Sequence, residues 1–215
     1  MKIGILGTGM VGSAIGTKLV QLDHEVKMGS RTADNSKAAE WAKANGEKAS
    51  HGTFADTAAF GEMLFNCTTG MKSIDALKLA DEKNMSGKIL VDIANPLDFS
   101  KGMPPSLSVC NTDSLGEQIQ RTFPSVKVVK TLNSVNCKVM VNPSLVHGDH
   151  DMFICGNNSA AKEMVTGILK DWFGWKSVID LGGITGARAM EMLLPIWLKL
   201  METFNTANFN LKIIR

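Results

Sequence analysis

Short apolar runs alternate along this chain with segments in which apolar residues recur at helical spacing. We predict strands at residues 2–6, 25–28, 63–68, 88–93, 127–132, 152–155 and 177–181, with a weaker one at 47–50. Helical patterns lie at about residues 11–22, 35–45, 160–173 and 185–205. Strands that alternate with helices are typical of a parallel sheet with crossover helices. The pattern therefore predicts an α/β fold with a doubly wound, mainly parallel sheet and a small helical extension at the C-terminal end.

A glycine motif separates the first predicted strand from the first predicted helix. It reads Gly7-Thr8-Gly9-Met10-Val11-Gly12, which is G-x-G-x-x-G in the strand-to-helix context that gives the pattern its specificity. We expect Gly7 to permit a tight turn, Gly9 to let the backbone approach a pyrophosphate, and Gly12 to let the helix pack closely on the sheet. The N–H groups at the start of the helix would bind the phosphate charge. The motif predicts a Rossmann-type dinucleotide-binding domain.

The end of the second predicted strand indicates which dinucleotide binds. NAD sites usually place Asp or Glu here, where the carboxylate accepts a hydrogen bond from the ribose 2′-hydroxyl. This chain instead has Ser30, Arg31 and Thr32, with Lys37 further along. Arg31 can bind a 2′-phosphate through two charge-assisted hydrogen bonds, whereas a carboxylate would repel that phosphate. We therefore expect NADP(H) as the cofactor. The alternative is an Arg31 that only stacks on adenine or points into solvent.

The loops that follow three later strands carry short hydroxyl and amide side chains. Ligands of a doubly wound sheet bind outside the carboxyl ends of its strands, so these loops are candidates for the nicotinamide half of the site. A structural role as turns or caps is the alternative for each loop. The cofactor candidates in the first two loops are Thr68, Thr69, Gly70, Ala94, Asn95 and Pro96. The third loop covers residues 133–136.

The predicted helix at 185–205 is apolar over most of its circumference. Its charged residues are expected to share one narrow stripe: Arg188, Glu191, Lys199 and Glu202. Pro195 should kink the helix. A helix of this kind must be buried on several sides, and one small sheet cannot cover it. We therefore expect a homodimer, with Trp197 and Met201 on an apolar face far from the glycine loop.

The composition is that of an ordinary globular protein. Hydrophobic residues make up 44% and charged residues 20% of the 215 residues, and the net charge is +2. The basic residues are spread along the chain, so we expect no nucleic-acid partner, and no apolar stretch predicts a membrane span. Because a strand begins at once, no leader is expected, and we expect a cytoplasmic protein. Its cysteines are expected to be reduced and mostly buried: Cys67, Cys110, Cys137 and Cys155.

The whole chain resembles the NADP oxidoreductases that depend on the deazaflavin coenzyme F420. The resemblance is carried by Gly7–Gly12, Gly29-Ser30-Arg31, Asn95-Pro96, Leu132-Asn133-Ser134, Asp151–Gly156 and Glu191–Pro195. The reductase domain of the metazoan six-transmembrane ferric reductases is similar through the same elements. The resemblance implies NADP lying across the sheet, with its 2′-phosphate on Ser30 and Arg31. It also implies a nicotinamide pocket near Thr69, Asn95 and Cys137.

The loop after the sixth strand departs from the archaeal members, which have His and Pro where this chain has Asn133 and Asn136. In the family, a second ring stacks on the nicotinamide beside this loop. The resemblance thus makes Asn133, Ser134 and Asn136 the candidates for an acceptor pocket, and implies coenzyme F420 or a flavin as the second substrate. We expect residues 1–135 to form the NADP-binding domain and residues 136–215 to complete the acceptor site and the dimer contacts, within what can be one compact domain.

Hydride transfer between a nicotinamide and a flavin-like ring needs alignment and exclusion of water but no protein nucleophile. This agrees with the absence of any catalytic triad or paired carboxylates in the sequence. The one His/Asp cluster, at 147–151, is expected to be a polar loop, and no metal site is predicted. Two other functions stay open. They are an NADPH-dependent reductase of a small carbonyl or imine, and a module that senses NADPH without turnover.

Overall fold

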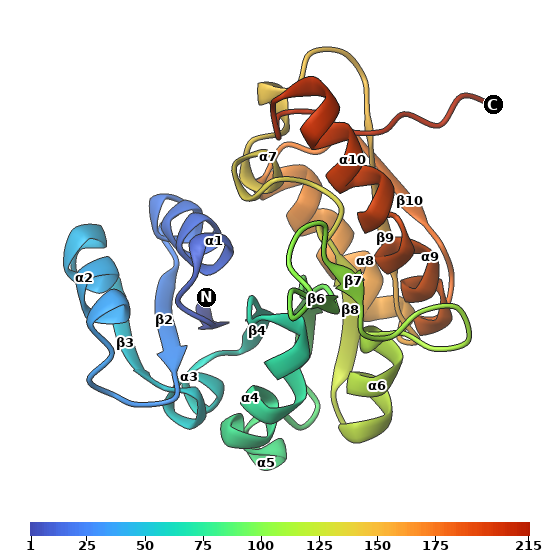
Figure 1. Ribbon diagram of the computed structural model, residues 1–215. Helices are drawn as coiled ribbons and strands as arrows, with labels where there is room; N and C mark the ends of the chain where they lie inside the picture. The colour runs from blue at the N-terminus through green and yellow to red at the C-terminus, as the bar shows by residue number, and fades with distance from the viewer.

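An eight-stranded sheet forms the centre of the computed structural model, which describes residues 1–215 (Figure 1). Its strands lie in the order β10-β9-β8-β5-β4-β1-β2-β3. Neighbouring strands are parallel except β8 and β9, so the predicted doubly wound, mainly parallel sheet is confirmed. The strands are β1 (Lys2–Leu6), β2 (Glu25–Ser30), β3 (Ala49–Thr53), β4 (Met63–Asn66), β5 (Ile89–Asp92), β8 (Lys127–Thr131), β9 (Asp151–Cys155) and β10 (Ser177–Asp180).

The order of the strands reverses at β1. The chain runs from β1 outward through β2 to β3 and then returns to β4, which pairs with the other side of β1. Such a reversal opens a crevice at the carboxyl ends of the two strands, where ligands of doubly wound sheets bind. The glycine loop after β1 and the loop after β4 lie at this crevice.

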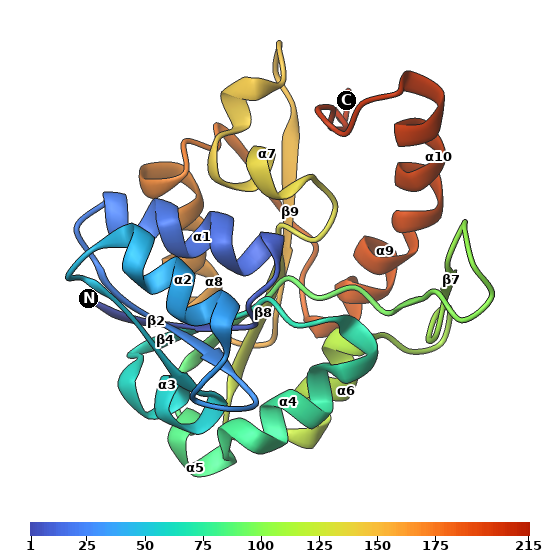
Figure 2. The same cartoon turned by 60° about the vertical axis from the view of Figure 1, so that its left-hand side comes forward.

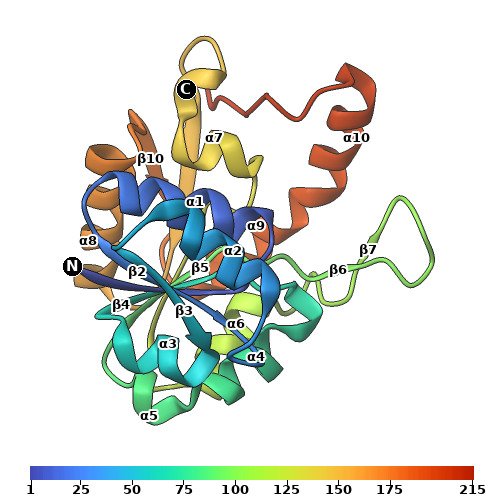
Figure 3. The ribbon, with the colours of Figure 1, turned by 90° about the vertical axis from the view of Figure 1, so that its left-hand side faces the viewer.

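Helices cover both faces of the sheet (Figures 2 and 3). One face carries α1 (Met10–Gln21), α2 (Ser36–Asn45), α7 (Cys137–Val141) and α8 (Ser159–Gly167), which continues into the π-helical turn η3 (Ile168–Trp172). The other carries α3 (Phe54–Phe60), α4 (Ser73–Ala80), α5 (Glu82–Met85) and α6 (Leu115–Thr122). The 3₁₀ turns η1 (Gly70–Lys72) and η2 (Pro143–Leu145) precede α4 and follow α7. A small hairpin, β6 (Leu97–Asp98) and β7 (Ser106–Leu107), projects from the body (Figure 3).

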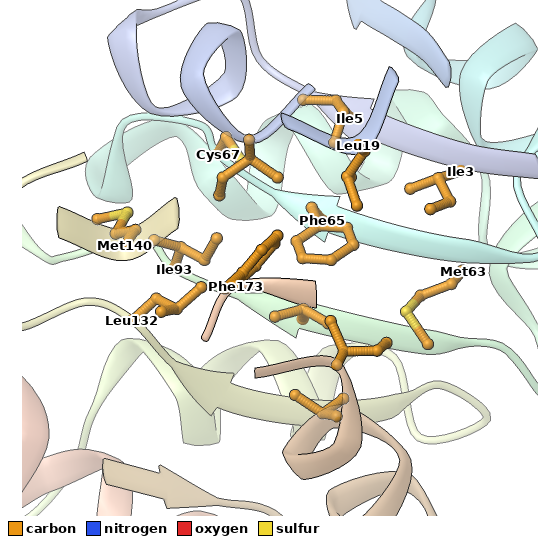
Figure 4. Close-up of a cluster of buried hydrophobic side chains, with 14 of the residues drawn as sticks. Ile3, Ile5, Leu19, Met63, Phe65, Cys67, Ile93, Leu132, Met140 and Phe173 are labelled. Atoms are coloured by element: carbon orange, nitrogen blue, oxygen red, sulfur yellow. The ribbon is translucent and has the colours of Figure 1, made fainter. Parts of the chain in front are cut away.

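Side chains that alternate along the strands supply two cores, one on each face of the sheet. Figure 4 shows part of the first core. In β4, Met63 and Phe65 point into the core beneath α1, and Leu64 points into the core beneath α4. The first core has 28 buried residues and joins Val135 to Met152 of β9. Residues 1–135 and 136–215 therefore share one sheet and contribute to both cores.

The C-terminal segment folds as a 3₁₀ turn and two helices: η4 (Ile184–Gly186), α9 (Ala187–Met192) and α10 (Leu194–Phe204). The helix is interrupted at Leu193 because Pro195 has no N–H and cannot lie in the interior of a continuous helix. Pro195 lies instead in the first turn of α10, where no N–H is needed. The single polar stripe predicted along this segment is wrong. The break turns Glu191 inward, where only 1% of it is exposed, whereas Lys199 and Glu202 are exposed.

Candidate active site

The glycine loop after β1 has the geometry that its three glycines predict. Gly7 has φ +119°, and a Cβ there would lie 2.6 Å from the carbonyl oxygen of Cys67. A Cβ on Gly12 would lie 2.2 Å from the carbonyl oxygen of Gly7. Beside Gly9 there is no heavy atom within 4 Å of where a Cβ would be. Two glycines are thus required by close packing, and the middle one faces open space.

The start of α1 is suited to an anion. Gly9 precedes the helix and offers no side-chain cap, and the backbone N–H groups of Met10, Val11 and Gly12 donate no hydrogen bond within the protein. Free N–H groups at the positive end of a 12-residue helix are an anion site by electrostatics and hydrogen bonding together. The half-buried Thr8 lies between the buried Gly7 and the exposed Gly9. This cradle fits the pyrophosphate of a dinucleotide.

The end of β2 carries two exposed cations. Arg31 and Lys37 are exposed, and neither forms an ion pair with a carboxylate. Thr32 is exposed beside them. Ser30 is only 5% exposed, and its hydroxyl donates to the carbonyl oxygen of Thr32. This hydrogen bond stabilises the turn on which Arg31 and Thr32 are exposed.

A cavity of about 350 Å³ lies at the carboxyl ends of β1, β4, β5 and β8. It brings together most of the predicted strand-end residues: Met10, Val11, Thr68, Thr69, Gly70, Ala94, Asn95, Asn133, Asn136 and Cys137. Pro96 and Ser134 are not among the lining residues, since both are buried in the loops behind it. The sequence missed the apolar wall that faces these loops, made by Leu97, Phe99, Met140, Leu194, Trp197 and Leu198.

Trp197 is closer to the glycine loop than predicted. We expected it far from that loop, but Trp197 of α10 and Met10 of α1 line the same cavity. The aromatic ring of Trp197 stacks on Phe209 of the C-terminal tail, with ring centroids 5.4 Å apart. The terminal helix therefore lines the cavity of its own chain.

Two asparagines tie together the loops after β5 and β8. The side-chain amide of Asn95 donates to the carbonyl oxygen of Asn133 at 2.7 Å. The amide of Asn133 donates to Oδ1 of Asn95 at 2.9 Å and to the carbonyl oxygen of Met190 at 3.0 Å. Asn133, in the wall of the cavity, is only 2% exposed, and these contacts occupy its side-chain NH2 group, whereas its Oδ1 has no hydrogen-bond partner in the protein.

A buried ion cluster lies behind this wall. Lys130, Asp92 and Glu191 have fully or almost fully buried side chains, and the ammonium is 2.8 Å from Asp92 and 2.9 Å from Glu191. Sequence reasoning missed the cluster, although a lysine inside an otherwise apolar strand was its signal. Burial lowers the pKa of Lys130, but the two carboxylates outweigh that effect and raise it above its ordinary value. Lys130 is therefore an ammonium ion.

No acid or base of the usual kinds lines the cavity. Its 19 lining residues include no Asp, Glu, His, Lys or Arg. Two lining residues are cysteines, and burial followed by the nearby Asp92 raises the pKa of the Cys67 thiol, which stays protonated. Thr68 uses its hydroxyl internally, at 2.7 Å from both Asn66 Oδ1 and the Ser73 hydroxyl. The cavity can align and shield rings but offers little for proton transfer.

Several other predicted features have a structural explanation. In the His/Asp segment at 147–151, residues 147–150 form a loop and Asp151 begins β9; His150 Nε2 contacts the carbonyl oxygen of Pro143 at 3.0 Å. No group of three or more His, Cys, Asp or Glu side chains is arranged to hold a metal ion. None of the helices combines the length and apolar character that crossing a bilayer requires. Of the four cysteines, Cys67 and Cys155 are buried, Cys137 is partly buried and Cys110 is exposed, so the expectation of mostly buried thiols is only half right.

Comparison with known proteins agrees with this geometry. The profile of the family described as "NADP oxidoreductase coenzyme F420-dependent" matches residues 2–96. The crystal structure of an Arthrobacter sp. FB24 protein, described as a "putative f420 dependent nadp-reductase", is 51% identical, covers 100% of both chains and has a TM-score of 0.94. The chain belongs to the F420-dependent NADP oxidoreductase family. It is therefore an enzyme of the NADP-dependent oxidoreductase class.

Two more distant relatives of this oxidoreductase and one protein that shares only its fold are also similar to the chain. The F420-dependent NADP reductase of Methanocaldococcus jannaschii is 27% identical over 99% of this chain and 98% of the relative. The metalloreductase STEAP3 of Rattus norvegicus is 28% identical over 91% of this chain, which spans only 38% of that protein. An imine reductase of Streptomyces aurantiacus, 18% identical with a TM-score of 0.69 over 95% of this chain and 64% of its own, shares the fold.

Proposed function

We propose that this oxidoreductase transfers a hydride between NADP(H) and a deazaflavin or flavin-like ring. The observation that carries the proposal is the cavity at the strand ends, whose 19 lining residues include no Asp, Glu, His, Lys or Arg. Reduction of a carbonyl develops charge on one oxygen, and an enzyme normally supplies a proton or a strong donor there. A conjugated ring system spreads the charge of an added hydride over its own atoms. Such an acceptor suits a site that supplies alignment and dryness.

The cofactor would lie across the carboxyl ends of β2, β1, β4 and β5. The free N–H groups of Met10, Val11 and Gly12 would bind the pyrophosphate, and Arg31 with Lys37 and Thr32 the 2′-phosphate. The loops at Thr68–Gly70 and Ala94–Asn95, with Cys137, would hold the nicotinamide. NADPH, when bound, supplies a hydride from its nicotinamide ring.

The acceptor would enter from the apolar side of the same cavity. Phe99 is 53% exposed on the β6–β7 hairpin, and Trp197 faces the cavity from α10. Aromatic and aliphatic walls are suited to a planar ring, because stacking and burial need no charged partner. Residues 1–135, together with Cys137, would then hold the cofactor, and Asn136, Leu194 and Trp197 would complete the acceptor site from the second part of the chain.

We also propose a homodimer, on the evidence of α10. Only Leu194 of this helix is buried, although the helix is predominantly apolar. Ile196 and Phe204 are each 55% exposed, and α10 stands apart from the body of the molecule in two views (Figures 2 and 3). An exposed apolar helix face usually marks an interface, and a second copy of this chain would cover it.

Turnover of defined acceptors tests the proposed reaction. NADPH oxidation would be followed by stopped flow against coenzyme F420, FMN, FAD and a panel of carbonyls and imines, between about pH 6 and pH 8.5. We expect turnover with at least one ring acceptor and a rate of hydride transfer that changes little with pH, because no lining carboxylate, imidazole or amine titrates. Turnover confined to carbonyls or imines would refute the proposal. Tight NADPH binding with no turnover of any acceptor would favour a sensing role.

A further inference from the structure

The buried ion cluster carries a net negative charge. The Lys130 ammonium contacts Oδ2 of Asp92 at 2.8 Å, Oε1 of Glu191 at 2.9 Å and the carbonyl oxygen of Ala94. The side chains of the three charged residues are at most 1% exposed. One cation and two anions leave a net charge of −1, in a region where water cannot screen it.

Hydrogen-bond donors surround both carboxylates. Oε2 of Glu191 accepts from the N–H of Leu115 at 2.8 Å, and Oε1 accepts from the N–H of Gly116 at 3.0 Å, at the start of α6. Oδ1 of Asp92 accepts from the Asn66 amide at 2.8 Å. Only hydrogen-bond donors therefore face these carboxylate oxygens. The partial positive charge at the start of α6 offsets about half of one charge and leaves the cluster negative.

The cluster is adjacent to the wall of the cavity. Ala94 lines the cavity, and its carbonyl oxygen is a ligand of the Lys130 ammonium. Met190, which precedes Glu191, holds the Asn133 amide in the same wall. A ring in the cavity is separated from the ammonium by the backbone at Ala94. By Coulomb's law, the negative potential of two anions bound to one cation exceeds the positive potential of that cation at any point farther from it than about 4 Å. The ring would therefore lie in a negative potential.

We propose that this cluster favours binding of the oxidised, cationic nicotinamide over binding of the reduced, neutral one. The inference rests on the proposed function, which puts the nicotinamide in this cavity. When the hydride leaves with both electrons of its C–H bond, the ring becomes a pyridinium and the flavin-like acceptor gains the hydride. Glu191 and Lys130 touch neither reactant, so they act as positioning residues through the electrostatic field.

Cofactor affinities measured on Glu191→Gln test the field. Glutamine keeps the size of the side chain and an oxygen for Lys130 and the N–H of Gly116, but removes one negative charge. We expect the ratio of the dissociation constants, NADP⁺ over NADPH, to rise at least about threefold. The constants would come from NADPH fluorescence titration and from its competition by NADP⁺. If Glu191 had a purely structural role, the variant would bind NADP⁺ and NADPH more weakly by the same factor.

Glu117→Gln is the matched control. Glu117 is also a buried glutamate near the start of α6, but it pairs with Arg188, whose side chain is 37% exposed and screened by water. The ratio should not change in this variant. Asp92→Asn removes the second negative charge and should also raise the ratio, so it serves if Glu191→Gln fails to fold by circular dichroism. An unchanged or lower ratio in whichever variants fold, or failure of both to fold, overturns the inference. A wild-type protein that binds neither cofactor would instead overturn the proposed function.

Discussion

Replacing Gly9 with valine separates the binding role of the glycine loop from its folding role. Gly9 is exposed, has φ −85° and ψ −175°, and has no heavy atom within 4 Å of an added Cβ. Valine readily adopts this extended conformation, so the change should alter the free energy of unfolding by less than about 0.5 kcal/mol. The new isopropyl group would instead fill the space through which a pyrophosphate reaches the N–H groups of Met10 and Val11.

The expected loss of binding follows from those N–H groups. A hydrogen bond to a charged group contributes about 1.5–3 kcal/mol, so loss of two of them weakens NADPH binding by at least about 3 kcal/mol, which is more than a hundredfold. Gly12→Ala should instead lower the stability of the fold. Its Cβ would lie 2.2 Å from the carbonyl oxygen of Gly7, and overpacking of this kind costs about 1–3 kcal/mol of stability. For a chain of this length, Tm should fall by roughly 2–12 °C.

The assay pairs fluorescence titration of NADPH with thermal unfolding followed by circular dichroism, on wild type and both variants. We expect Gly9→Val to keep the wild-type Tm and to lose NADPH binding. The main effect of Gly12→Ala should be a lower Tm. If folded Gly9→Val binds NADPH within tenfold of wild type, the loop is not the pyrophosphate site. An unchanged Tm in Gly12→Ala would show that the close approach to Gly7 is not required.

Three further predictions follow from surface groups. NADPH should bind at least about tenfold tighter than NADH, about 1.4 kcal/mol, and Arg31→Ala should remove most of that difference in titrations while leaving NADH affinity nearly unchanged; equal affinities in wild type would contradict this. Ile196→Glu combined with Phe204→Lys should give a monomer by light scattering that still binds NADPH, and a monomeric wild type at tens of micromolar would refute the dimer. The hydrogen bond from Arg121 lowers the pKa of Asp113 in the folded protein. At a pH above about 4, the ordinary pKa of Asp, the Asp113 carboxylate therefore stabilises the fold. This stabilisation is lost as the pH falls through the lower pKa of the folded state. Wild type should therefore exceed Asp113→Asn in Tm at pH 7, and the difference should narrow below about pH 4; a difference that stays constant with pH would contradict this.

The sequence by itself determined the elements whose signals are local. The alternation of strands and helices, the G-x-G-x-x-G spacing and the absence of an acid after β2 are all contiguous in the chain, and each has a direct physical meaning. The predicted strands correspond to the eight strands of the large sheet, although β3 lies at Ala49–Thr53, some residues later than expected. Helices α3 to α6 were not predicted, because they are four to eight residues long and give little periodicity.

The tertiary structure decided the contacts between residues that are far apart in the chain. The position of Asn133 after a strand predicts a site residue, but only the fold shows that its NH2 group donates to Asn95 and Met190 and that its Oδ1 is left without a partner. Local spacing puts Glu191 in one narrow stripe with the other charged residues of the C-terminal helix. The interruption of that helix at Leu193 separates Glu191 from Lys199 and Glu202, and Glu191 pairs with Lys130. Local pattern cannot reveal such partners, because whether a charged side chain faces water or a buried counter-ion depends on which elements the fold packs against it.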